Sequence, residues 1–301
     1  MSNERSRGIV GIFILVFTLF IIFLIFAFYT ISNLKGTITV DSAPIGVIEV
    51  DGVIMDSKIT IKKLLKAEED KGIKAIIMRI NSPGGAVGPT QEIYEEIRRI
   101  DEKKPVYASF GTVAASGGYY IGAACRKIYS NAGALTGSIG VIMNFMNLEK
   151  VYEWAKVKPE IIKAGKYKDI GSSSRGMTNE ERLLMQEMIA KVHDQFINDI
   201  YKVRSEKIEG GKEALRSYAQ GQIFSGEGAR ERGLVDEIAG LWQAGRMIHD
   251  ELKLESEFDL KFIKVKKENP SLFEMINDME EKVKTLTSGV TLYPVPLFLH
   301  Q

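Results

Sequence analysis

The stretch KAIIMRINSPGGAVGPTQEIYEEIRRIDEKKPVYASFG, residues 74–111, decides the fold class of this chain. It begins with a short apolar strand that ends at SPGG, and it closes with a second apolar strand, PVYASFG. Between them, Ile93, Ile97 and Ile100 recur at helical spacing, which predicts an amphipathic helix. Short apolar strands that alternate with helices are typical of a parallel sheet covered by helices on both faces. The sequence therefore predicts an α/β fold.

The flanking sequence continues this alternation. Residues 44–54 are rich in β-branched side chains and predict another strand, and residues 126–142 predict a strand, a glycine-rich turn and a further strand. A long helix is expected over 179–203, because Thr178 and Glu181 have the spacing of a capping box. The apolar face of that helix is predicted to include Leu184, Met188, Val192, Phe196 and Ile200.

Helical patterns also dominate the C-terminal third of the chain. Residues 221–240 predict a turn, a short amphipathic helix and a turn, and helices are expected through LWQAGRMIHDEL and over 271–286. No internal repeat, low-complexity tract or domain linker interrupts the pattern. One large domain is therefore expected.

Composition excludes several classes of function. The chain has 301 residues and a net charge of +1, which lacks the strongly basic balance of a nucleic-acid-binding domain. Its single cysteine, Cys125, excludes an internal disulfide framework. The three histidines, His193, His249 and His300, include no H-E-x-x-H pair, so we expect neither a hydrolytic zinc site nor any other cofactor.

The N-terminus predicts a membrane anchor. Residues 9–28 carry no charge over 20 positions, which is the length of one bilayer crossing and longer than the apolar core of a signal peptide. Arg5 and Arg7 precede this span, so the positive-inside rule places the N-terminus in the cytoplasm. The expected parts are a cytoplasmic N-terminus and anchor at 1–35, an extracytoplasmic domain at 36–288 and an apolar tail at 289–301.

A lone serine in VAASGGYYIGA, Ser116, is the candidate nucleophile. It lacks the G-x-S-x-G elbow of α/β-hydrolases, because Ala114 stands where the first glycine belongs. With so few histidines, the base must be another group, and a lysine can serve if it is deprotonated near neutral pH. For this, burial must lower the pKa of the lysine by roughly three units, which corresponds to about 4 kcal/mol of free energy between its charged and neutral forms. Spacing alone leaves Lys163, Lys166 and Lys168 as alternatives.

Glycine-rich turns supply a candidate oxyanion hole, in which backbone N–H groups stabilise the developing negative charge. In NSPGG, Pro83 fixes a turn, and Gly84 and Gly85 leave the backbone free of side chains. Gly117, directly after Ser116, offers a second amide if a helix begins there. The alternative for each turn is tight packing without chemistry.

Four segments together carry a resemblance that no single motif does: RINSPGG, AASGGYYIG, TGSIGV and FSGEGARERGLVDEIAG. In this order they resemble the signal peptide peptidases of the SppA type, serine proteases of the ClpP/crotonase fold with its repeated ββα units. The resemblance spans roughly residues 44–265. It implies a peptidase that needs no metal or other cofactor.

The resemblance also assigns roles to residues. It implies that Ser116 is the nucleophile, that Lys168 in GKYKD is its base, and that Ser138 in TGSIGV orients the lysine amine. It places the oxyanion donors at Gly84 or Gly85, beside Gly117. Asp169 is expected to point away from the dyad, because a neighbouring carboxylate would favour the ammonium form. Tyr119 and Tyr120 are expected to pack the helix.

Further implications concern partners and substrates. Short members of the family carry one catalytic repeat, so a homo-oligomer, a ring or dome, is expected to complete the groove. The implied substrates are apolar peptides, notably signal peptides left at the membrane. Two alternatives are a non-catalytic membrane-tethered scaffold of the same fold and a crotonase-like acyl-CoA enzyme. The tail segment 292–300 is interpreted as a subunit contact, ahead of a pseudo-substrate in the groove or a buried extension.

Overall fold

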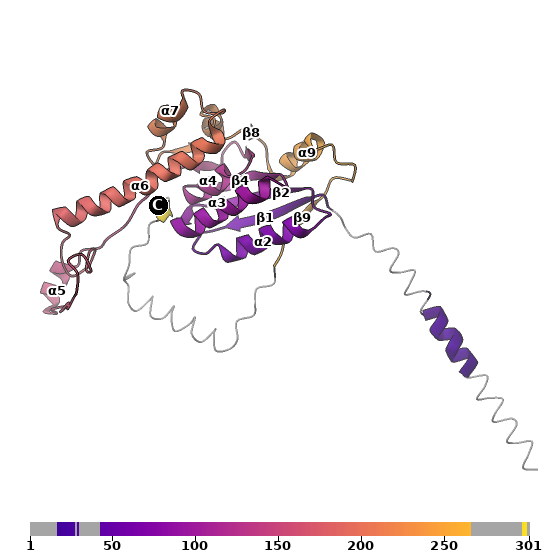
Figure 1. The fold of residues 1–301 in the computed structure, drawn as a ribbon, viewed down its shortest axis with the longest axis horizontal. Coiled ribbons are helices and arrows are strands. Elements are labelled where there is room, and N and C mark those ends of the chain that lie inside the picture. The colour runs from indigo at the N-terminus through magenta and orange to yellow at the C-terminus, as the bar shows by residue number, and fades with distance from the viewer. Residues whose placement is uncertain (1–16, 28, 30–42, 266–296, 300–301) are drawn as a thin grey trace, which may run out of the picture. The chain divides into compact units, whose positions relative to one another are not determined.

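The computed structural model describes residues 17–27, 29, 43–265 and 297–299 (Figure 1). The chain divides into two units, Met1–Ser42 and Ala43–Gln301. In the first unit, residues 17–27 are helical. Within the described ranges no helix has both the length and the apolar character to cross a bilayer, and much of the predicted anchor, 9–28, lies outside them.

The second unit is built on a mostly parallel sheet. Its strands run in the order β7-β6-β4-β2-β1-β9, and β5 pairs with β4 and with β8. All of these pairs are parallel except β6 with β7. The strands are β1 (Ile45–Asp51), β2 (Ala75–Ser82), β4 (Val106–Ala115), β5 (Lys127–Ser130), β6 (Leu135–Gly137), β7 (Ile223–Ser225), β8 (Glu237–Ile238) and β9 (Leu260–Phe262). The predicted α/β class is confirmed.

Helices cover both faces of this sheet. The helices of the second unit are α2 (Lys58–Glu69), α3 (Val87–Asp101), α4 (Gly117–Ala123), α5 (Glu149–Ala155), α6 (Asn179–Arg204), α7 (Gly211–Tyr218), α8 (Gly226–Glu231) and α9 (Leu241–Glu251). Helices α2, α3 and α4 pack on one face of the sheet and α9 on the other, whereas α5 has no buried residue. The sequence patterns missed α2, α5 and α7. The helix expected at 271–286 lies outside the described residues.

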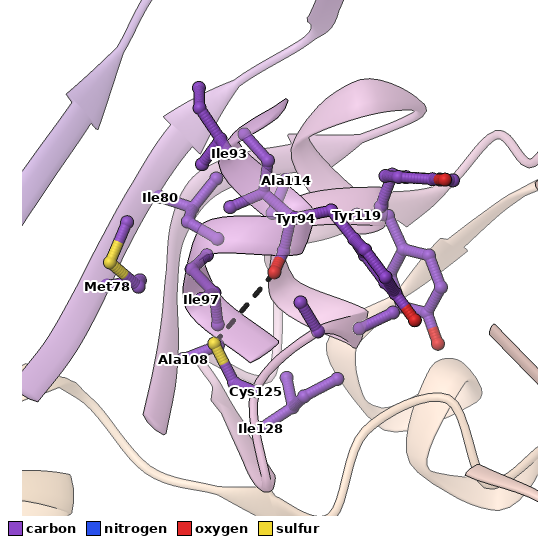
Figure 2. Close-up of a cluster of buried hydrophobic side chains, with 14 of the residues drawn as sticks. Met78, Ile80, Ile93, Tyr94, Ile97, Ala108, Ala114, Tyr119, Cys125 and Ile128 are labelled. Atoms are coloured by element: carbon purple, nitrogen blue, oxygen red, sulfur yellow. Dashed lines mark hydrogen bonds between the residues drawn. The ribbon is translucent and has the colours of Figure 1, made fainter. Parts of the chain in front are cut away.

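Strand alternation divides the core into two clusters. Because successive side chains of a strand point to opposite faces, Ile48 and Met78 join the large cluster under α2, α3 and α4, whereas Val47 and Ile77 join a smaller one under α9. Figure 2 shows part of the large cluster, with Tyr119 of α4 among its labelled side chains. Each fully buried isoleucine contributes roughly 1.5–3 kcal/mol by leaving water.

Helix α6 is only partly supported by this core. Its capping box is present: Thr178 Oγ1 accepts from the Glu181 amide at 3.2 Å, and the Thr178 amide donates to Glu181 Oε2 at 2.8 Å. Of the predicted apolar face, Phe196 and Ile200 are buried, but Leu184 is 42% exposed. The prediction was wrong for the first half of the helix, which extends beyond the core toward α5 (Figure 1).

A short strand from the C-terminal tail lies against the glycine turn. Strand β10 (Leu297–Leu299) pairs antiparallel with β3 (Gly84–Ala86), so that Phe298 stands opposite Gly85. Figure 1 shows this pair beside α3 and α4. The remainder of the tail predicted at 289–301 lies outside the described residues.

Candidate active site

Ser116 occupies a strained position between β4 and α4. Its φ of 54° and ψ of −117° lie in a region that residues other than glycine rarely adopt. The residue is completely buried, and its Oγ has no hydrogen-bond partner among the described residues. Buried hydroxyl groups are normally satisfied, so an unpartnered one at a strained corner is a functional-site signal.

The glycines after Ser116 bring α4 against the SPGG turn. A Cβ on Gly118 would lie 2.6 Å from the carbonyl oxygen of Ser82, closer than real Cβ contacts. The first turn of α4 therefore fits against the end of β2 only without a side chain at this position. At the start of α4, the amides of Gly117 and Gly118 have no carbonyl one helical turn earlier to accept their protons.

Strand β3 distinguishes the two candidate oxyanion glycines. The Gly84 amide donates to Ser82 Oγ at 3.1 Å, and the Gly84 carbonyl accepts from the Ile54 amide at 2.8 Å. The Ala86 amide donates to the Ile54 carbonyl at 2.7 Å, so Ile54 occupies one edge of β3. By the alternation of a strand, the Gly85 amide and carbonyl face the other edge. Gly85 rather than Gly84 thus presents its amide to this outer edge, on which β10 lies in the described structure.

The TGSIG turn meets the same corner. The Ser116 amide donates to the Gly137 carbonyl at 2.8 Å, which places the next residue, Ser138, beside the nucleophile. Ser138 is 6% exposed and has a positive φ of 49°. Its amide donates to the Gln222 carbonyl at 2.6 Å. The fourth motif segment joins this corner as well, because Phe224 of β7 pairs with Thr136 of β6, so all four segments are adjacent in the folded chain.

Lys168 is not brought to this corner by the fold of its own chain. It lies between α5 and α6, in a segment that we call the arm, residues 143–178, of which no residue is buried. Lys163 bonds Asp169, and Lys166 bonds Glu180 at 2.5 Å. Of these three lysines, Lys168 alone has no hydrogen bond or ion pair from its Nζ to the described residues.

The carboxylate beside Lys168 has other partners. Arg175 Nε donates to Asp169 Oδ2 at 2.9 Å. This bond and the bond from Lys163 hold the pKa of Asp169 well below its usual range. Arg175 also binds Glu181, the capping residue of α6, at 2.6 Å. The arm is thus tied to the start of α6. That Asp169 points away from the dyad stays a prediction.

A cavity of about 490 Å³, lined by both apolar and polar side chains, lies between the arm and α6. Its lining includes Met143, Phe145, Met146, Met177 and Met185. A second hollow of about 340 Å³ shares Gln186 and Ile189 with it and reaches Gly140, two residues after Ser138. The two hollows together form a trough that runs from the neighbourhood of Ser138 along α6.

The comparison with protein families decides the identity. The model described as peptidase family S49 matches residues 98–255, and the model described as Clp protease matches residues 48–134. The chain belongs to peptidase family S49. The S49 match contains Ser116, Ser138 and Lys168, and the Clp protease match contains the glycine strand and Ser116.

Relatives of this S49 peptidase carry matching names. A Synechocystis sp. protein that is named as a protease is 42% identical over 192 residues, which are 64% of this chain and 68% of that protein. An Enterococcus faecium protein named for signal peptide peptidase SppA is 36% identical, over 59% of this chain and 51% of its own. The chloroplastic serine protease SPPA of Arabidopsis thaliana is 30% identical, over 79% of this chain and 35% of its own.

These findings place the chain among SppA-like S49 proteases. The expectation of a serine-type peptidase is confirmed, in preference to the scaffold and the acyl-CoA enzyme. The chain spans about half the length of the Enterococcus relative and about a third of that of the Arabidopsis relative.

Proposed function

We propose that this peptidase is a membrane-anchored endopeptidase that cleaves apolar peptides, including residual signal peptides, with Ser116 as nucleophile and Lys168 as base. One observation supports it above the others: a buried, unpartnered serine hydroxyl stands at a strained corner between the glycine strand β3 and the start of α4. The residual signal peptides come from the family resemblance and from the apolar N-terminal stretch, which would hold the enzyme where such peptides remain.

The proposed reaction follows from these groups. Lys168 removes the proton from Ser116 as Oγ attacks the peptide carbonyl carbon, and the amides of Gly85 and Gly117 stabilise the oxyanion. The lysine then donates that proton to the departing amine, which leaves an acyl-enzyme. Water attacks the acyl group and gives a proton to the lysine, which returns it to Ser116 Oγ as the ester C–O bond breaks, so that the carboxylic acid, the serine hydroxyl and the neutral lysine are released. Ser138 holds the lysine amine toward Ser116 without a charge that would favour ammonium.

The lysine in this scheme comes from a second copy of the chain. Ser116 lies in the core of its own chain, whereas Lys168 lies on an arm that the described residues of its own chain leave uncovered. The arm exposes large apolar side chains, including Trp154 at 86%, and further ones at Val151, Val157, Ile161 and Ile162. Apolar surface of this kind favours burial against a partner. A neighbouring copy that covers the arm would place its lysine in an apolar environment, which disfavours the charged ammonium.

Substrate is proposed to bind as an extended strand. The outer edge of β3 presents the Gly85 amide and carbonyl, and a peptide laid along it would pair with both. The chain's own β10 lies on this edge, which demonstrates that an extended segment fits there. The trough beside Gly140 would take apolar side chains, since flexible methionines adapt to varied shapes.

The experiment is hydrolysis of a fluorogenic apolar peptide by the full chain in detergent, between pH 6 and 10. Ser116→Ala and Lys168→Ala are expected to lower turnover by at least about 1,000-fold. Lys166→Ala, which removes an exposed lysine two residues away, is the matched control and should retain turnover. The wild-type rate should rise with an apparent pKa below the value of about 10.4 for a free lysine. Activity that survives Lys168→Ala would refute the assignment of the base.

A further inference from the structure

We infer that Tyr120 and Asp199 are a positioning pair that holds Ser116 in its attacking conformation and joins it to α6. The inference rests on the proposed role of Ser116 as nucleophile. Neither residue contacts the groups that would react, so neither is a catalytic residue. Their effect on the reaction passes through the backbone of α4.

The backbone around Ser116 needs external support, because its φ and ψ are unfavourable for serine. Two main-chain hydrogen bonds hold it. On the strand side, the Ser116 amide donates to the Gly137 carbonyl at 2.8 Å. On the helix side, the Tyr120 amide donates to the Ser116 carbonyl, also at 2.8 Å. The second bond makes the position of Tyr120 a direct determinant of the orientation of the Ser116 peptide group.

The side chain of Tyr120 is in turn fixed on three sides. It is 1% exposed, and its ring lies 4.8 Å from the Tyr94 ring and 4.7 Å from the Phe196 ring, between centroids. Its hydroxyl donates a short hydrogen bond to Asp199 Oδ2. Burial and the neighbouring carboxylate raise the pKa of Tyr120 far above its usual value, so the phenol keeps the proton it donates.

Asp199 is the point at which three helices meet. Its carboxylate binds Tyr120 of α4, and its main-chain carbonyl accepts from the Tyr94 hydroxyl of α3 at 3.0 Å. Asp199 itself belongs to the supported end of α6, next to the buried Ile200. The other end of α6 begins directly after the arm that carries Lys168. The pair therefore connects the helix of the nucleophile to the helix that supports the arm.

The neighbouring Tyr119 is a matched control. It is equally buried, and its hydroxyl also makes one inter-element hydrogen bond, to the Leu234 carbonyl at 3.0 Å. Its ring packs against Phe110 rather than against α6. Its amide does not donate to Ser116. Removal of either hydroxyl deletes a buried hydrogen bond between elements, but only the bond from Tyr120 to Asp199 belongs to the chain of contacts between Ser116 and α6.

The test measures kcat, KM and thermal unfolding of the full chain with the fluorogenic apolar peptide. Tyr120→Phe and Asp199→Ala should each lower kcat about tenfold with KM within about twofold of wild type. The double variant should be no slower than either single one, because the two residues act as one unit. Asp199→Asn keeps an acceptor oxygen and should recover most of the rate. Tyr119→Phe should lower the unfolding temperature by about as much as Tyr120→Phe does, but its kcat should stay within about twofold of wild type.

Two results would overturn the inference, and they are distinguishable. An active wild type in which Tyr120→Phe and Tyr119→Phe lose rate equally, or in which Asp199→Asn is as slow as Asp199→Ala, refutes the positioning pair alone. A folded, assembled wild type that cleaves no peptide refutes the proposed function, and the positioning pair with it.

Discussion

Every residue from Ala114 to Cys125 is buried, whereas no residue of the arm, 143–178, is buried. The first region contains Ser116 and the second contains Lys168, so the two halves of the proposed dyad lie in opposite surroundings. The corner around Ser116 is shaped by the core of its own chain. The arm exposes large apolar side chains that no described residue of its own chain covers.

This difference has a consequence for mutations. Changes near Ser116 should act within one chain and should appear in both folding and activity. Changes on the arm should leave the fold of each chain intact and act through assembly. The following experiments test that division, in order of expected effect.

The largest effect is expected from Gly118→Ala. The added Cβ would lie 2.6 Å from the Ser82 carbonyl oxygen, so α4 must move away from the glycine turn and misalign Ser116. Turnover should fall by about 100-fold or more, because the loss of one aligned oxyanion donor alone lowers kcat by about that factor. Gly88→Ala on α3 is the control, because nothing lies within 4 Å of its added Cβ. Equal activity of the two variants would show that the close packing is irrelevant.

A substantial but smaller effect is expected from Trp154→Glu. The side chain is 86% exposed, so its own chain should unfold at an unchanged temperature, while a charge in the interface should weaken assembly. Light scattering should show smaller particles, and activity should fall by roughly tenfold at low protein concentration. Ile59→Glu, at a 45% exposed position of α2, is the control. Unchanged assembly with Trp154→Glu would remove the arm from the interface.

A modest gain is expected from truncation after Ser288. Strand β10 and an extended substrate cannot occupy the same edge of β3, so removal of the tail should lower the apparent KM by a few fold, in line with loss of a weak intramolecular competitor. Steady-state kinetics on both chains measure the change, and light scattering tests for loss of a subunit contact. Unchanged kinetics and assembly would contradict both interpretations of the tail.

The smallest effect concerns the join between the arm and α6. The bond from Arg175, then that from the Thr178 amide, lowers the pKa of Glu181 to about 2. Because this carboxyl pKa is lower in the folded state, the ionised Glu181 stabilises the folded state at every pH above the ordinary pKa of about 4.5. That stabilisation is lost as the pH falls through about 2. Amides in the first turn of α6 should therefore keep their hydrogen-exchange protection at pH 4 in wild type. Glu181→Gln should reduce it at pH 7; equal protection would show that the charge has no role.

Local sequence patterns predicted the sheet, α3, α6 and the motif turns well, because strand and helix periods are written in neighbouring residues. They missed the support of Ser116 by Tyr120 and Asp199, which are 79 residues apart and meet only in the folded chain. They misjudged Leu184, because its apolar spacing indicates a buried face without telling which surface covers it. The choice of Gly85 over Gly84 needed the position of Ile54, which no local pattern contains.

The central claim, that a serine in one core works with a lysine from another copy, is tested most directly by mixing two inactive chains. Full-length Ser116→Ala and Lys168→Ala chains would be co-expressed in equal amounts, and the activity of the mixed assemblies compared with that of each variant alone. If each site takes its serine from one copy and its lysine from the next, a site works only when both of these residues are intact. Half of the copies carry each intact residue, so random mixing should restore about a quarter of the wild-type activity. Mixed assemblies that remain as inactive as the separate variants would contradict the account.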